Sequence, residues 1–190
     1  MNETNQYINS VQKIIVKRQS LSFVSSCVFI APNIALTAAH SVYGQDSVEC
    51  LGHVASDVIV HKNYNQKVSN YLNDIAIVIF KRQVSHFVKI SEDLIGLKFF
   101  RVGFGLRNNK NNRAHFVIDL ESAREKFNKF FDVSSVVGDS GGGIFNSRQE
   151  LVGIHSTKEG NEIYTVNLEY YMDWITPYIN KSHLPVHPSL

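Results

Sequence analysis

The sequence predicts an all-β protein with one helix near its C-terminus. Short apolar or alternating runs recur along the chain between polar or glycine-containing turns, which is typical of a β-sandwich or β-barrel. Near the end of the chain, Leu168, Tyr171, Ile175 and Ile179 recur at helical spacing instead. The 190 residues fit a single domain of this class.

The patterns place the predicted elements in order along the chain. Strands are expected at Val11–Lys17, Phe23–Ala31, Val48–Leu51, Asp57–His61, Asp74–Lys81, Lys98–Phe104, His115–Leu120, Gly142–Phe145, Leu151–His155 and Glu162–Asn167. We expect the helix over residues 168–180, with Pro177 fraying or kinking its end, because proline cannot donate the helical hydrogen bond. Residues 182–190, which contain Pro185 and Pro188, are predicted to form a loose tail.

Composition argues against nucleic-acid and membrane partners. The formal net charge is only +2, and the one mild basic cluster, at residues 110–113, lies in an asparagine-rich loop. No segment approaches the roughly 20 apolar residues that a membrane helix needs. The first residues are polar and do not resemble a secretory signal. We expect a secreted or extracytoplasmic protein whose signal is absent from this chain, and an intracellular location stays open.

Cys27 and Cys50 are the only cysteines in the sequence. A disulfide between them would close a loop of about 23 residues and stabilise the fold by about 3 kcal/mol in the chain-entropy model. The alternative is a pair of separate buried thiols. We favour this alternative because two cysteines are weak support for an oxidising compartment.

Three motifs, in the order His, Asp and Ser, carry the chemistry. Residues 36–40 are LTAAH, residues 73–76 are NDIA and residues 138–142 are GDSGG. A serine hydroxyl stays protonated at neutral pH, so a histidine must take its proton and a buried carboxylate must hold the imidazole in the right tautomer. The sequence therefore predicts Ser140 as nucleophile, His40 as general base and Asp74 as orienting acid.

These motifs resemble the three signatures of the chymotrypsin-fold, or trypsin-like, serine proteases. The matching segments are TAAHS at 37–41, NDIAIVIF at 73–80 and GDSGGGIF at 138–145, and VGFG at 102–105 and GIHS at 153–156 add support. The likeness runs from about Ile14 to Ile179. It implies an all-β fold of two six-stranded antiparallel β-barrels, with the active site between them and a C-terminal helix.

The resemblance also implies how the chain is organised. A single protease domain spans residues 1–181, with an N-terminal barrel at about 10–90, a C-terminal barrel at about 95–167 and the helix at 168–180. It implies no metal or cofactor, a protein or peptide substrate, and a monomer. Most animal members place a disulfide cysteine directly after the catalytic histidine, where this chain has Ser41. That difference favours a bacterial or viral type of protease.

The same resemblance assigns the oxyanion hole to the backbone N–H groups of Gly138 and Ser140. In members that are activated by cleavage, the equivalent of Asp139 pairs with a newly exposed N-terminal amine. Residues 13–16, KIIV, resemble such a cleavage site only superficially and align better with the first barrel strand. Activation by N-terminal insertion is therefore not expected, and the partner of Asp139 stays open.

The S1 pocket, which receives the substrate side chain before the cleaved bond (P1), is expected to include Ser134 and Ser135. Trypsins carry an aspartate where Ser134 falls, so a preference for Lys or Arg loses its main support. His155 resembles the histidine that hydrogen-bonds the substrate side chain in glutamyl endopeptidases and in viral relatives that cut after Gln or Glu. A site built on such donors rejects side chains that lack an acceptor.

The remaining pocket candidates do not all favour the same specificity. Ser156 matches the family serine that opens the substrate-pairing strand beside the catalytic acid, and Thr157 follows it. Lys158 would place a favourable positive charge at the pocket rim. Glu162 matches a pocket-wall position that is usually glycine, and an inward-pointing carboxylate would repel an acidic P1 residue and attract Lys or Arg.

We therefore predict a serine endopeptidase, nearest to the bacterial and glutamyl-endopeptidase-like members, that favours Glu or Gln at P1. One alternative is the same protease with a basic or aromatic P1 preference. Another is a catalytically silent homologue that acts as a binding module.

Overall fold

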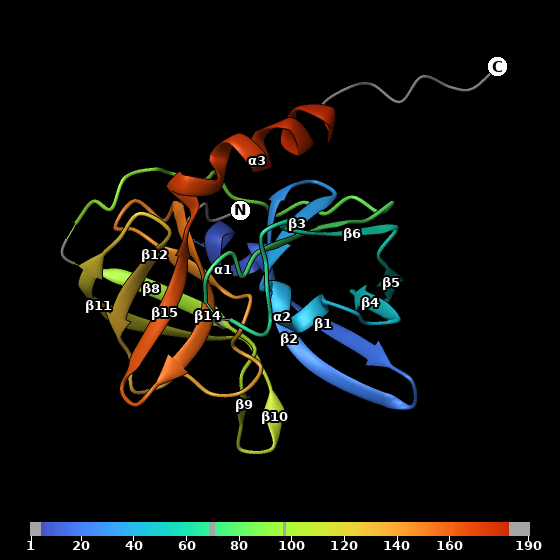
Figure 1. The fold of residues 1–190 in the computed structure, drawn as a ribbon, viewed down its shortest axis with the longest axis horizontal. Coiled ribbons are helices and arrows are strands. Elements are labelled where there is room, and N and C mark those ends of the chain that lie inside the picture. The colour runs from blue at the N-terminus through green and yellow to red at the C-terminus, as the bar shows by residue number, and fades with distance from the viewer. Residues whose placement is uncertain (1–4, 69–70, 97, 183–190) are drawn as a thin grey trace.

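Two β-units lie side by side, with a helix across one end (Figure 1). The computed structural model describes residues 5–68, 71–96 and 98–182. The predicted all-β fold with a C-terminal helix is confirmed. Residues 183–190, which make up most of the expected tail, lie outside the described residues.

The N-terminal unit is a curled seven-stranded antiparallel sheet with the order β5-β4-β1-β2-β3-β7-β6. Its strands are β1 (Val11–Arg18), β2 (Leu21–Ala31), β3 (Ile34–Thr37), β4 (Ser47–Cys50), β5 (His53–Val54), β6 (Asp57–Val60) and β7 (Ala76–Ile79). The edge strands β5 and β6 follow each other in the chain, β5 pairing with β4 and β6 with β7. Between them, Ala55 donates to Val48 and Ser56 to Ile79. One extended segment therefore joins the two edges of the sheet.

The C-terminal unit is a closed six-stranded barrel with the order β11-β12-β15-β14-β13-β8. Its strands are β8 (Phe99–Gly103), β11 (Ala114–Ala123), β12 (Phe127–Phe131), β13 (Gly143–Phe145), β14 (Leu151–Glu159) and β15 (Glu162–Asn167). A separate hairpin of β9 (Leu106–Arg107) and β10 (Lys110–Asn111) projects from it (Figure 1). Asn108 and Asn109 turn this hairpin at φ 51° and 61°, a backbone region that asparagine tolerates.

Several elements were not predicted from the sequence. They are strands β3, β5, β9, β10 and β12, and the short helices α1 (Gln6–Ser10) and α2 (Ala39–Val42). Most are too short to show a period. In β12 the inward-facing residues are Asn128 and Phe130, so a buried amide interrupts the apolar alternation.

Three apolar clusters hold the molecule together. One lies inside the N-terminal sheet and contains Ile14 and Phe29, and another lies inside the C-terminal barrel and contains Phe99 and Phe130. The third joins the two units. It combines N-terminal residues Val28, Ile30, Leu36 and Ile75 with C-terminal residues Val102, Phe104, Phe145, Leu151 and Ile154. The active-site motifs border this third cluster, so its packing sets how the two units face each other.

Helix α3 (Leu168–Ser182) adds to the third cluster through Leu168, Tyr171 and Ile175. The Tyr171 hydroxyl accepts a hydrogen bond from the backbone N–H of Asn73 at 3.2 Å and donates one to the Asn73 side-chain oxygen at 3.0 Å. These bonds fix the turn that precedes Asp74. The expectation of fraying at Pro177 is wrong, because the helix continues to Ser182.

Cys27 and Cys50 are free, buried thiols. Burial and a hydrogen bond with the Cys50 thiol raise the pKa of Cys27 well above its ordinary value. A different pair links β2 to the helix that carries His40. There the hydroxyl oxygens of Ser25 and Ser41 lie 2.8 Å apart in a hydrogen bond.

This serine pair predicts a stabilising cross-link. Replacing both Ser25 and Ser41 by Cys is expected to form a disulfide across 16 residues, because the two side chains already meet. The closed loop should stabilise the fold by about 3 kcal/mol and raise Tm by about 6–12 °C, reversibly on reduction. Thermal unfolding with and without reductant measures the effect, with each single Cys variant as control. An oxidised double variant that melts no higher than its reduced form would contradict the prediction.

Candidate active site

Ser140 lies on a tight turn between the two β-units. Gly138 and Gly141 have φ angles of +99° and +83°, which favour glycine. A Cβ at Gly141 would also lie 2.1 Å from the carbonyl oxygen of Ser26 on β2. Two hydrogen bonds join this turn to β2. The Ser140 carbonyl accepts from the Ser26 N–H at 2.9 Å and from the Ser25 hydroxyl at 2.7 Å. The glycines of the motif therefore let the nucleophile turn press against the N-terminal unit.

His40 and Asp74 form a tightly coupled pair. The Asp74 carboxylate is fully buried and accepts from the His40 backbone N–H at 2.7 Å. Its other oxygen, Oδ2, lies 2.6 Å from His40 Nδ1. The Ser156 hydroxyl donates to the same Oδ2 at 2.5 Å. A proton on Nδ1 satisfies this contact and leaves Nε2 unprotonated, the tautomer that a general base requires.

The Ser140 hydroxyl points toward the second β-unit. Its Oγ donates to the carbonyl of Ser156 at 3.1 Å, and no hydrogen bond joins it to His40 within the described residues. His40 and Ser140 nevertheless line the same two cavities. Catalytic hydrogen bonds are often long or misaligned before substrate binds, so this arrangement does not exclude His40 as the base.

The backbone N–H groups of Gly138 and Ser140 donate to no acceptor in the described part of the chain. Their neighbours are engaged: Asp139 N–H donates to Val136 at 3.1 Å and Gly141 N–H to His155 at 2.8 Å. Two free N–H donors on one turn, one on Ser140 itself and one two residues before it, are the kind of arrangement that stabilises a developing oxyanion.

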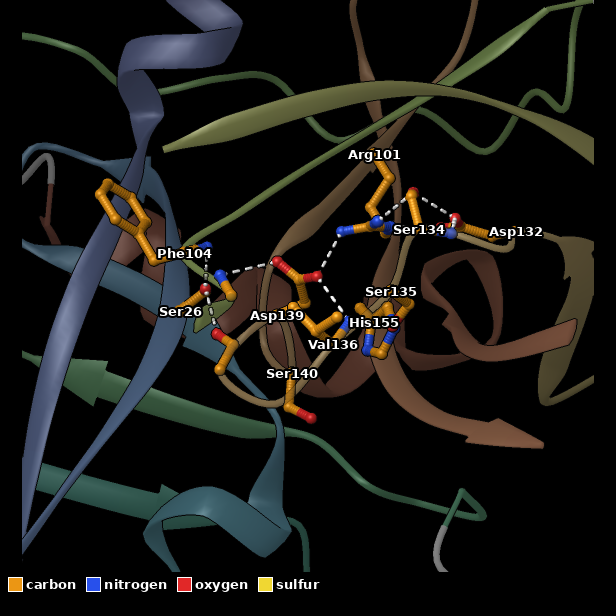
Figure 2. A network of polar contacts seen from close by, with 12 residues as sticks. Ser26, Arg101, Phe104, Asp132, Ser134, Ser135, Val136, Asp139, Ser140 and His155 are labelled. Atoms are coloured by element: carbon orange, nitrogen blue, oxygen red, sulfur yellow. Dashed lines mark hydrogen bonds and ion pairs between the residues drawn. The ribbon is translucent and has the colours of Figure 1, made fainter. Parts of the chain in front are cut away.

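Asp139 points away from Ser140 into a buried polar cluster (Figure 2). Its Oδ1 accepts from the Gly105 N–H at 2.8 Å and from Arg107 Nη1 at 3.3 Å. Its Oδ2 accepts from Arg107 Nη2 at 2.5 Å and from the Val136 N–H at 3.0 Å, and lies 2.9 Å from Arg101 Nη1 in an ion pair. Burial acts to raise the pKa of Asp139, but the Arg107 hydrogen bond and the Arg101 charge outweigh it and lower the pKa.

Arg101 lies between two carboxylates, Asp139 and Asp132 (Figure 2). Its side chain is fully buried, and its Nε donates to Asp132 while its Nη2 donates to Ser134 Oγ at 2.8 Å. The Ser134 hydroxyl donates onward to Asp132 at 2.5 Å. Burial opposes ionisation of Asp132, but the hydrogen bond and charge of Arg101 hold its pKa below the ordinary value. These contacts keep the buried charges paired.

A cavity of about 310 Å³ adjoins the triad. It is lined by the triad members His40 and Ser140 together with Ser135, Val136, Val137, His155, Ser156, Thr157 and Lys158. At its wall, Ser135 Oγ and His155 Nε2 lie 2.8 Å apart in a hydrogen bond. His155 Nδ1 is buried and has no hydrogen-bond partner among the described residues. Burial and the charge of Arg101 lower the pKa of His155 to about 4, so the imidazole is neutral at pH 7.

Two predicted pocket residues lie elsewhere. Ser134 does not line the cavity, because its hydroxyl is engaged by Arg101 and Asp132 behind the pocket wall. Glu162 does not line this cavity either. It lies on the partly exposed outer side of the barrel, where its carboxylate forms an ion pair with Lys129 at 2.7 Å. The register of β15 against β12 places Glu162 opposite Phe131, at the strand end away from the triad.

A second cavity, of about 400 Å³, lies on the other side of Ser140. Its lining includes Phe23, Val24 and Val137, and the exposed fractions of Phe23 and Val137 are 51% and 85%. The two cavities meet at His40 and Ser140 and form one cleft past the nucleophile. Within the described residues, no group of three or more His, Cys, Asp or Glu side chains is placed to hold a metal ion. No described helix is long and apolar enough to cross a membrane.

Sequence reasoning missed Arg101, Arg107 and Asp132. A signal existed for one of them, since Arg101 interrupts the apolar run FFRVGF at 99–104, and a charge inside a buried strand requires a partner. Nothing in the sequence showed which carboxylates would meet it, because they come from distant segments.

The comparisons with known proteins agree on the fold. The family profile described as Trypsin matches residues 2–175, and no curated protein matches the chain. HL collagenase superposes with a TM-score of 0.79 at 19% identity, over 93% of this chain and 95% of that one. An inactivated protease paralogue of the scabies mite has a TM-score of 0.77 at 15% identity, over 93% and 96%. The VesB protease of Vibrio cholerae has a TM-score of 0.71 at 20% identity, over 89% and 64%.

The buried histidine predicts a pH-dependent stability. Because the folded pKa of His155 is about 4 against an ordinary 6.5, only the unfolded chain binds this proton between those values. The stability that the neutral, buried His155 side chain contributes is therefore fully present above pH 6.5 and is lost as pH falls toward 4. Between pH 7 and pH 5, His155 should account for about 2 kcal/mol of lost stability. Urea unfolding at both pH values, compared with His155→Gln, measures this share. An unchanged pH dependence in the variant would contradict the assignment.

Proposed function

Because the chain belongs to the trypsin family, we propose that it is a serine endopeptidase that hydrolyses peptide bonds through an acyl-enzyme on Ser140. The observation that carries the proposal is the 2.6 Å contact between His40 Nδ1 and buried Asp74, next to the cleft that contains Ser140. The substrate is a protein or peptide, and we propose that the chain acts as a monomer.

The proposed cycle follows from the positions of these groups. His40 Nε2 takes the proton of Ser140 Oγ as that oxygen attacks the substrate carbonyl. The N–H groups of Gly138 and Ser140 donate to the oxyanion of the tetrahedral intermediate. His40 then gives its proton to the leaving amine, and in the second half-reaction it activates water against the acyl-enzyme. Asp74 stays ionised and stabilises the imidazolium in each half.

For specificity, we propose that the cavity beside Ser140 accepts Glu or Gln at P1, as in glutamyl-endopeptidase-like members. Ser135 and His155 form a pair of polar groups at its wall, and neutral His155 has an N–H to donate. A side-chain carboxylate or amide oxygen placed between them would accept from both. An aromatic or aliphatic P1 side chain would leave these buried groups without partners, which selects strongly against it.

Lys158 adds a positive charge to the rim of this cavity. Its ammonium group donates to the carbonyls of Val133 at 3.2 Å and Ser135 at 3.0 Å, across the pocket mouth. A cation held there favours an acidic side chain and disfavours Lys or Arg. With Glu162 outside the pocket, the proposed preference for basic P1 residues loses the carboxylate on which it depended.

One observation favours the alternative of a catalytically silent homologue. Ser140 Oγ is bonded to the Ser156 carbonyl and not to His40, and one similar structure is that of an inactivated paralogue. We favour the enzyme because two observations support it: His40 Nδ1 lies 2.6 Å from buried Asp74, and the N–H groups of Gly138 and Ser140 have no acceptor among the described residues.

Digestion of a mixed peptide library tests the activity and its specificity together. The wild-type chain is expected to cut after Glu or Gln, and Ser140→Ala should abolish cleavage while its circular dichroism spectrum stays unchanged. Mass spectrometry of the products identifies the P1 residue. Equal cleavage by Ser140→Ala would overturn the proposed nucleophile. Cuts after basic or aromatic residues would overturn the proposed pocket, and no labelling of folded wild-type chain by an active-site phosphonate would favour the silent homologue.

His155 provides a sharper test of the pocket. His155→Leu removes the N–H donor and leaves the Ser135 hydroxyl without its partner, so kcat/KM for a Glu or Gln P1 peptide should fall about 10²-fold or more. The rate of labelling by a small phosphonate should change little, because the triad is untouched. His53→Leu, on exposed β5, is the matched control. An equal fall in both rates would assign His155 to structure and not to substrate recognition.

A further inference from the structure

The turn that presents the oxyanion donors depends on where the Asp139 side chain lies. Gly138 and Ser140 flank Asp139, so the backbone conformation that directs its carboxylate into the buried cluster also sets the directions of these two N–H groups. The carboxylate is fully buried. A buried, unpaired carboxylate is strongly disfavoured, so the active shape of the turn requires a cation at this point.

Two guanidinium groups supply that cation from within the chain. Arg101 comes from β8 inside the barrel, and Arg107 comes from β9 of the projecting hairpin. Arg107 also donates to the Ser134 carbonyl at 2.8 Å, so it joins the hairpin to both ends of the 134–139 loop. The two guanidinium groups lie over the same aromatic ring, at 5.0 Å and 4.8 Å from the centre of Phe116.

The charges in this cluster balance. Asp139 and Asp132 carry two negative charges, and Arg101 and Arg107 carry two positive charges. Every oxygen of Asp139 has donors, including the backbone N–H groups of Gly105 and Val136. A further cation at Asp139 would leave the buried cluster with an excess positive charge. The site is therefore complete without a contribution from a chain terminus.

The one segment of the chain that resembles an activation sequence is not free to reach this cluster. Ile14, which cleavage after Lys13 would expose, lies in the middle of β1 and is fully buried. It pairs with Ser25 on β2 and with Cys50 on β4. Releasing its amine would remove the central pairing of the N-terminal sheet.

We propose that Arg101 and Arg107 hold residues 138–140, the oxyanion turn, in the active shape. The chain is then active without any proteolytic exposure of an N-terminal amine. Arg107 is a positioning residue that acts through Asp139. This inference rests on the proposed serine protease function. It adds that activity does not depend on whether residue 1 carries a free amine or is joined to a preceding segment.

An N-terminal fusion tests independence from the terminus. A folded protein joined to Met1 through a short linker should leave kcat/KM for the preferred peptide within about twofold of the unfused chain. Intact mass after the assay confirms that the fusion was not removed. If the fusion is inactive and unlabelled by a phosphonate until it is trimmed, the inference is overturned while the serine protease function stands. If no form is labelled, trimmed forms included, the proposed function itself is overturned.

Arg107 variants test the mechanism, since this side chain is one-quarter exposed and the change is more easily tolerated than at Arg101. Arg107→Gln should lower kcat by about 10²–10³-fold with little change in KM, because the oxyanion donors lose their position. Guanidinium ion at millimolar concentration should restore part of the lost rate. Arg148→Gln, an exposed arginine on the same unit, is the matched control and should behave as wild type.

Arg107→Lys gives a signature that a merely structural role would not produce. The groups that face this position are Asp139, Arg101, Asp132 and His155. The pKa values of Asp139 and Asp132 lie below their ordinary values and that of His155 is about 4, so these three groups do not titrate between pH 8 and 10. A lysine there is charged at pH 8 and should restore activity. Its deprotonation near pH 10 should create an alkaline fall in kcat that wild type lacks, because guanidinium stays charged. Full activity in Arg107→Gln, or no new alkaline limb in Arg107→Lys, overturns the proposal.

Discussion

The buried carboxylate of Asp139 is the constraint on which the active site depends. It sits between the two oxyanion donors, and its burial requires positive charge at a point deep between the barrel and the nucleophile turn. One arginine would neutralise it, but Arg101 is itself buried and reaches Asp132 as well. Four charges from β8, from the β9–β10 hairpin and from the 132–139 loop are therefore assembled together. The cost of leaving any one of them unpaired exceeds what a surface ion pair contributes, so these segments are fixed relative to each other.

The same cluster links catalysis to substrate recognition. Arg101 faces Asp139 on one side, and on the other its charge, together with burial, lowers the pKa of His155. Burial is the main cause of the low pKa of His155, and the cation that pairs with Asp139 lowers this pKa further. A neutral imidazole beside Ser135 offers a donor without adding a buried charge to the pocket. The proposed pocket and the proposed oxyanion hole consequently share one buried cation, Arg101.

The sequence was sufficient for the fold class, and it singled out His40, Asp74 and Ser140, which the fold brings to one cleft, because glycine-rich turns and the apolar strand after Asp74 are local signals. It was insufficient wherever the outcome depended on pairing between distant segments. Glu162 lies on the pocket side of β15 only in a register that the structure does not adopt, and a shift of one residue reverses the face. The same limit applies to Asp139, because its partners Arg101 and Arg107 come from segments more than thirty positions away. Pro177 shows the opposite case, in which a strong local signal is overridden because the helix on both sides packs against the core.

The catalytic geometry belongs to the interface between the two β-units and not to either unit alone. Ser26 on β2 donates its hydroxyl to the Gly138 carbonyl at 2.8 Å and accepts from the Phe104 N–H at 2.8 Å, which bridges the N-terminal sheet to the C-terminal barrel at the oxyanion turn. Ser156 of the barrel holds Asp74 of the N-terminal unit in the same manner. A serine of the N-terminal unit therefore holds the turn that carries Ser140, and a serine of the C-terminal unit holds Asp74. Since these hydrogen bonds are short-ranged and directional, a small separation of the two units would disrupt both the oxyanion turn and the His40–Asp74 pair before either unit lost its own core. The shared apolar cluster between the units opposes that separation, so packing remote from Ser140 helps to set the geometry of the proposed active site.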